Sequence, residues 1–227
     1  MRAQPEVVEL TDGLGFQLRI EGDCPLDRAA SVVDALCRQV GERGGQHVVV
    51  LRLAGVPADS SWPGAVEVQQ VNRWERALRR LERLTAANIG VAEGTCGGPA
   101  LDLLLAADYR IATADLRLLL PVNEAHFWPG MAMYRLVAQL GMCRARQLVL
   151  WGHEILADRA LATGLVDEVA RDPEEAVQAA TVFLGRLSGR ELAVRRQLLL
   201  EAHSTSYEEA LGAHLAACDR ELRRVSG

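Results

Sequence analysis

The order of apolar and polar positions along the chain predicts strands that alternate with helices. Residues 47–53 (HVVVLRL) form an almost continuous β-branched run, which is typical of a strand buried on both faces. Residues 88–94 (NIGVAEG) are a second strand of this kind. Between them, residues 66–84 place their apolar side chains on one stripe and arginines at the other positions, the pattern of an amphipathic helix. The stripe consists of Val71, Trp74, Leu78, Leu81 and Leu84.

The flanking segments extend this pattern. Residues 6–21 predict a hairpin, and residues 26–43 predict a helix that ends at Gly44 and Gly45. From about residue 132 the pattern is mostly helical, including the segment ILADRALATG (155–164), with a short strand expected at 165–169. Because buried strands alternate with helices, we predict a single α/β domain with a helical C-terminal part.

Composition limits the possible functions. Hydrophobic residues make up 49% of the 227 residues, so the chain can bury a large core. The net charge is −5 and every basic side chain is arginine, which gives no basic footprint for nucleic acid. The N-terminus has no apolar signal segment and no run is long enough for a membrane helix, so we expect a cytoplasmic protein. The five cysteines form no CxxC pair, so neither a zinc site nor a disulfide framework is expected.

The most informative stretch is residues 88–108, NIGVAEGTCGGPALDLLLAAD, which predicts a strand, a glycine turn and a helix. Glycines let a backbone approach a ligand closely, and the start of a helix offers free N–H groups with a partial positive charge. Such a place suits a carbonyl oxygen that gains negative charge during a reaction. The alternative is a tight turn with a purely structural role.

Several segments, in order, resemble the crotonase (enoyl-CoA hydratase) superfamily. The likeness covers most of residues 47–210. It is carried by HVVVLRLAG with SSWPGAVEV, EGTCGGPALDLLLAADYRIAT, LPVNEAHFWPGMAMYRL, and LVLWGHEILADRALATGLVDEV.

This resemblance implies a fold and a chemistry. The fold would be a crotonase-like ββα superhelix, with a core over residues 1–150 and a helical trimerisation region of the same domain over 151–227. The substrate would be an acyl-CoA thioester, the assembly a homotrimer or hexamer, and no cofactor beyond that coenzyme A would be needed. In the family two backbone N–H groups bind the thioester oxygen. Transferred residue by residue, these donors fall on Ala65 and Pro99, and the substrate-binding positions are Trp62, Gly64, Gly97 and Val122.

The sequence departs from the family pattern at three positions, Pro99, Asp102 and Val122. Pro99 has no N–H to donate, so we expect the N–H of Gly98 or Ala100 to replace it. The first of two family glutamates is Asp102, and the second is Val122, which carries no proton. General acid–base catalysis needs a titratable group within hydrogen-bond reach, so Glu124 and His126 are further candidates from displaced positions.

Each candidate also has a structural interpretation. Asp102 lies in the first helical turn, where an acid favours the helix dipole. Glu124 suits a loop charge, and His126 suits packing beside Phe127 and Trp128. We expect Cys96 to be a small buried residue, since no base is paired with it.

A narrower resemblance concerns the DpgB group, auxiliary crotonases of 3,5-dihydroxyphenylglycine biosynthesis for glycopeptide-type antibiotics. It rests on NRWERALRRLERL, CGGPALDLLLAADYRIAT, WPGMAMYRL, ELAVRRQLLLEA and LGAHLAACDRELRR. It implies that the protein assists a type III polyketide synthase in forming 3,5-dihydroxyphenylacetyl-CoA from malonyl-CoA, through dehydration and aromatisation. Two alternatives stay open. One is a non-catalytic partner of the synthase or of a sister crotonase, with the arginine-rich helix as a contact face, and the other is an ordinary enoyl-CoA hydratase or isomerase.

Overall fold

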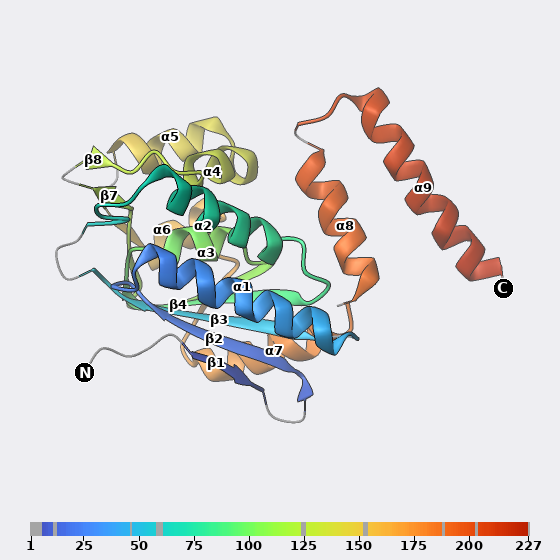
Figure 1. Cartoon of the computed structure of the whole chain (residues 1–227), viewed down its shortest axis with the longest axis horizontal. Coiled ribbons are helices and arrows are strands. Elements are labelled where there is room, and N and C mark those ends of the chain that lie inside the picture. The colour runs from blue at the N-terminus through green and yellow to red at the C-terminus, as the bar shows by residue number, and fades with distance from the viewer. Residues whose placement is uncertain are drawn as a thin grey trace.

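The structure is a computed structural model of the whole chain, with one mixed sheet covered by helices on both faces and a helical arm at the C-terminus (Figure 1). It describes residues 6–10, 13–45, 47–57, 61–123, 126–151, 154–187, 189–202 and 204–226. None of the helices in these ranges combines the length and apolarity needed to cross a membrane.

Within the described ranges, eight strands form one sheet, whose main path runs β1-β2-β3-β4-β5-β10. The pair β1–β2 is antiparallel, and the pairs from β2 to β10 along this path are parallel. A short branch follows, in which β6 pairs with the end of β4 and with β9. The strands are β1 (Glu6–Glu9), β2 (Gly15–Glu21), β3 (Val48–Gly55), β4 (Ala87–Cys96), β5 (Tyr109–Thr113), β6 (Arg117–Leu119), β9 (Glu154–Leu156) and β10 (Glu168–Ala170), and a separate hairpin consists of β7 (Val122–Asn123) and β8 (His126–Phe127).

Helices cover both faces of the sheet (Figure 1). One face carries α1, α2 and α3, and the other is covered by α7. The helices are α1 (Leu26–Arg43), α2 (Val68–Leu81), α3 (Ala100–Leu105), α4 (Ala132–Leu140), α5 (Met142–Trp151), α6 (Ala157–Thr163), α7 (Pro173–Gly185), α8 (Arg190–Glu201) and α9 (Tyr207–Ser226).

Side chains of β3 pack alternately into two cores, because successive residues of a strand point to opposite faces. Val49, Leu51 and Leu53 join the large core under α1, α2 and α3. Val48 and Val50 join a smaller core against α7. The predicted α/β class and the doubly buried strands are therefore confirmed.

One buried arginine docks the C-terminal arm. Arg196 of α8 is only 7% exposed, and its guanidinium donates to the Leu84 carbonyl at 2.5 Å, to the Ala86 carbonyl at 2.9 Å and to Asp108 at 2.7 Å. The α8 helix therefore attaches to the loop before β4. In Figure 1 the α9 helix lies beside α8, beyond the body of the protein.

Candidate active site

The glycine turn between β4 and α3 is fixed by close backbone contacts. The Gly97 N–H donates to the Gly55 carbonyl at 2.9 Å, which ties the turn to the end of β3. Gly98 has a φ of +58°, and a Cβ placed on it would lie 2.2 Å from the Gly22 carbonyl oxygen. Both conformation and contact therefore require glycine at position 98.

The expected oxyanion donors differ in whether they have a free N–H group. Pro99 precedes α3 as its N-cap and supplies no N–H. The Ala100 N–H already donates to the Gly97 carbonyl at 3.2 Å, which makes Ala100 the weaker substitute. In the part of the chain that the structure describes, the N–H groups of Gly98 and Ala65 have no hydrogen-bond partner. These two amides are the best remaining candidates for binding a thioester oxygen.

The segment that carries Ala65 is held by the β7–β8 hairpin. The Trp62 N–H donates to the Val122 carbonyl at 2.8 Å. Asn123 accepts from the Ser61 hydroxyl at 2.7 Å and donates to the Gly64 carbonyl at 3.3 Å. No local sequence pattern singles out Asn123, because its two partners lie about 60 residues earlier. Val122 contributes through its backbone, and its side chain has no group that titrates.

Asp102 lies in the first turn of α3 and is 5% exposed. Its Oδ2 accepts a hydrogen bond of 3.0 Å from the indole N–H of Trp74 on α2. Its Oδ1 is buried and has no hydrogen-bond partner among the described residues. Trp74 in turn packs edge-on against Trp62, with ring centroids 6.2 Å apart. A chain of contacts therefore joins Asp102 to the segment that carries Ala65.

Buried charges surround this carboxyl. Arg135 of α4 is 8% exposed and donates to Glu82 at 2.7 Å and to Glu75 at 2.9 Å. Burial raises the pKa of Asp102 to about 6, because the charged form loses its hydration. The negative charges of Glu75 and Glu82 act in the same direction, whereas Arg135 and the Trp74 hydrogen bond oppose the shift. A carboxyl with this pKa can accept and return a proton near neutral pH.

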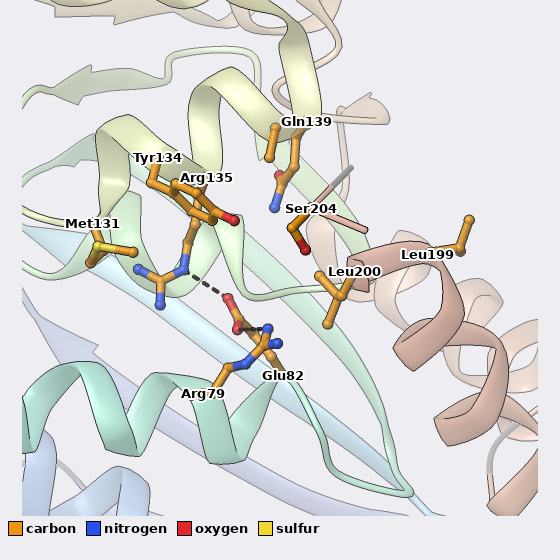
Figure 2. Close-up of a pocket in the computed structure, with 10 residues that line it drawn as sticks. Arg79, Glu82, Met131, Tyr134, Arg135, Gln139, Leu199, Leu200 and Ser204 are labelled. Carbon is orange, nitrogen blue, oxygen red and sulfur yellow. Dashed lines mark hydrogen bonds and ion pairs between the residues drawn. The ribbon is translucent and has the colours of Figure 1, made fainter. Parts of the chain in front are cut away.

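A cavity of about 320 Å³ lies on the outer side of this charge cluster, between α2, α4 and α8. Figure 2 shows Arg135 and Arg79 converging on Glu82, with Leu200 and Ser204 on the opposite wall. Arg79 donates to Glu82 at 3.1 Å, so this carboxylate is shared by two guanidinium groups. None of the predicted site residues that the structure describes lines this cavity.

Some predicted residues are not brought together. Glu124 lies outside the described residues, so its role stays a prediction. His126 is exposed on β8, and no hydrogen bond or ion pair between it and Asp102 occurs in the described ranges. Cys96 is fully buried, donates to the Leu53 carbonyl at 3.1 Å and has a pKa that burial raises to about 12. A thiol of this kind is protonated and unsuited to act as a nucleophile.

The site is closed. Residues 96–102 are buried, and an open depression of about 620 Å³ beside Ala65 is lined by Ala65, Val66, Glu67 and Gln70 without reaching Asp102.

The arginine-rich helix α2 is partly engaged within the molecule, since Arg80 pairs with Asp34 of α1 at 2.8 Å and Arg73 donates to Ser31 at 3.0 Å. These arginines support helix packing, so α2 does not present a fully free cationic face.

Comparison with known proteins places these features in a family context. Residues 63–223 match the family model described as enoyl-CoA hydratase/isomerase. A protein of Amycolatopsis orientalis named enoyl-CoA-hydratase is 46% identical over 208 residues, which cover 91% of this chain and 95% of the relative.

Solved structures of low identity share the fold, which confirms the predicted crotonase-like architecture. An enoyl-CoA hydratase/isomerase from Cupriavidus metallidurans CH34 superimposes with a TM-score of 0.77 at 18% identity, covering 98% of this chain and 90% of that one. An enoyl-CoA hydratase/isomerase from Marinobacter aquaeolei gives 0.76 at 17% identity, covering 97% and 91%.

Proposed function

Because the chain belongs to the enoyl-CoA hydratase/isomerase family, we propose that it adds water to, or removes water from, the carbon–carbon double bond beside an acyl-CoA thioester. The observation that carries this proposal is Asp102. It is a buried carboxyl in the first turn of the helix after the glycine turn, and one of its oxygens has no hydrogen-bond partner among the described residues.

The backbone would polarise the substrate. The Ala65 and Gly98 N–H groups would donate to the thioester oxygen, on which negative charge develops when water attacks. The absence of an N–H at Pro99 moves the second donor back by one residue. The Gly98 amide has the left-handed backbone and the close packing on Gly22 that fix its direction.

One carboxyl would perform both proton transfers. As water bonds to the β-carbon, Asp102 Oδ1 accepts its proton, and the electron pair of the double bond moves to the thioester oxygen. The enolate then takes the proton from Oδ1 at the α-carbon, which restores the carbonyl and the carboxylate. Dehydration is the same sequence reversed, and the aspartate is returned unchanged.

Asp102 is 5% exposed, and we propose that substrate access involves a displacement beside it. The 61–65 segment and the β7–β8 hairpin are joined by hydrogen bonds, so we propose that they move as a unit. Such a movement would open the space between Ala65 and the start of α3.

The test is direct. Purified protein is incubated with a 2-enoyl-CoA in oxygen-18 water, and the loss of the conjugated thioester absorbance is followed with mass spectrometry of the product. The expected product is 3-hydroxyacyl-CoA carrying the labelled oxygen. An unchanged substrate at high protein concentration would contradict the hydratase proposal.

A second candidate function is favoured by two departures from the family pattern, Val122 and Pro99. We propose, as the finer alternative, that the protein assists a type III polyketide synthase by dehydrating a cyclised intermediate on the way to 3,5-dihydroxyphenylacetyl-CoA. The same oxyanion donors and Asp102 would remove water from a β-hydroxy thioester.

Reconstitution separates the two candidates. A synthase of this type is supplied with malonyl-CoA, with and without this protein, and the aromatic product is quantified. A rise in that product with wild type but not with Asp102→Asn supports the dehydratase role. A rise of equal size with both proteins indicates a non-catalytic partner.

A further inference from the structure

Trp74 lies where two parts of the site meet. It is on the buried stripe of α2 together with Leu78 and Leu81, and it is 2% exposed. The indole therefore sits between the start of α3 and the segment that precedes α2. Neither the family resemblance nor the predicted site residues gave this side chain a role beyond the core.

The two ends of the indole have different contacts. Its N–H donates to Asp102 Oδ2 at 3.0 Å, a buried hydrogen bond across 28 residues of sequence. Its ring meets Trp62 in an edge-to-face geometry, with an interplanar angle of 80°. Trp62 belongs to the segment that carries Ala65, so one side chain contacts both the carboxyl and the support of an oxyanion donor.

Among the described residues, the other charged neighbours of Asp102 do not donate a hydrogen bond to it. From α2 and the residue after it, Glu75 and Glu82 face Asp102 and repel its charge. From α4, Arg135 attracts that charge, but its hydrogen bonds within the described ranges go to Glu75 and Glu82. In the described ranges, Trp74 is therefore the only side chain that donates a hydrogen bond to Asp102, and it does so at Oδ2.

We propose that Trp74 is a positioning residue of the active site, whose indole N–H fixes Oδ2 of Asp102 so that Oδ1 faces the reacting proton. The inference rests on the proposed function for its catalytic consequence. The effect of Trp74 on the orientation and ionisation of Asp102 does not depend on the proposed function. The indole ring also holds Trp62, which keeps the carboxyl in register with the Ala65 amide.

The test uses Trp74→Phe, which keeps an aromatic ring but removes the N–H donor. Because this hydrogen bond stabilises the carboxylate, its loss raises the pKa of Asp102 further. In protein labelled with carbon-13 at aspartate carboxyls, the Asp102 signal, identified by its absence in Asp102→Asn, should titrate at higher pH in Trp74→Phe. The rise of kcat/KM with pH should move in the same direction, with KM little changed.

The matched control is Trp151→Phe on α5, the same substitution at an exposed tryptophan far from Asp102 in the sequence. It should leave both the carboxyl titration and the pH profile of wild type unchanged. An Asp102 titration in Trp74→Phe that coincides with wild type would overturn the proposal.

A second measurement needs no substitution at Trp74. In nitrogen-15 tryptophan-labelled wild type, one of the four indole N–H signals should shift with an inflection near the Asp102 pKa of about 6. That inflection should vanish in Asp102→Asn. Four indole signals that stay constant through this range would contradict the proposal. A titrating signal in a protein without hydratase turnover would support the Trp74–Asp102 hydrogen bond and reject only the proposed reaction.

Discussion

The Asp102 carboxyl is buried without a full set of hydrogen bonds, which makes its ionisation costly. Its pKa is raised from 3.8 to about 6, a difference that corresponds to about 3 kcal/mol. Because the folded protein binds this proton more tightly than the unfolded chain does, the stabilisation is complete below about pH 4 and is lost as pH rises through 6. Above that range the ionised carboxylate destabilises the fold, which is the expected cost of keeping a proton-transfer group in a dry site.

Asp102→Asn should remove this pH dependence, since an amide stays neutral. The free energy of unfolding of the variant minus that of wild type should rise between pH 4 and pH 8 by up to about 3 kcal/mol in favour of the variant. Urea unfolding at several pH values measures this difference. A difference that is flat across the range would show that Asp102 ionises as readily in the folded protein as in the unfolded chain.

At the scale of elements, the hydrophobic pattern predicted individual strands, helices and turns. The β-branched run of β3, the stripe of α2 and the turn before α3 were all expected and are present. The long-range contacts of Asn123 and Arg196 were not expected, because neither residue can be distinguished by sequence from an ordinary surface residue. The strand β9 (Glu154–Leu156) overlaps the start of the segment 155–164 that was predicted as helix, since its pairing with β6 determines its conformation. The direction of the Trp74 N–H likewise depends on packing that no local pattern encodes.

The docking of α8 depends on Arg196, so removing this side chain should lower the free energy of unfolding. Arg196→Ala would leave Asp108 and the Leu84 and Ala86 carbonyls buried without their donor, so it should cost about 3–5 kcal/mol of unfolding free energy. Protease cleavage within the arm should also accelerate. The control is Arg195→Ala, the adjacent and exposed arginine, which should change stability by less than about 0.5 kcal/mol. Equal stability of the two variants would refute the anchoring role.

For the whole molecule, the C-terminal arm carries apolar side chains into solvent. Leu215 and Leu222 of α9 are 58% and 68% exposed. Large exposed apolar surface usually marks an interaction site. We propose that α9 packs against other copies of this chain in a homotrimer, as the family resemblance implies.

Leu215→Glu should therefore weaken assembly, because a charge would be buried at the interface. Sedimentation velocity should show wild type as a trimer, or a multiple of it, and the variant as smaller species. Val68→Glu, at an apolar residue that is 76% exposed at the start of α2, should keep the wild-type mass. A monomeric wild type would contradict the proposed assembly without affecting the chemistry at Asp102.

The pH dependence of kcat/KM for enoyl-CoA hydration tests the central claim most directly, because it reports the ionisation of the free enzyme's proton-transfer group. Wild type should rise with pH through about 6 and then level off. Asp102→Asn should lose about 10²–10⁴-fold and show no inflection, while Asp158→Asn, an exposed aspartate in the first turn of α6, should follow wild type. An Asp102→Asn protein with wild-type activity and the same inflection would contradict the account.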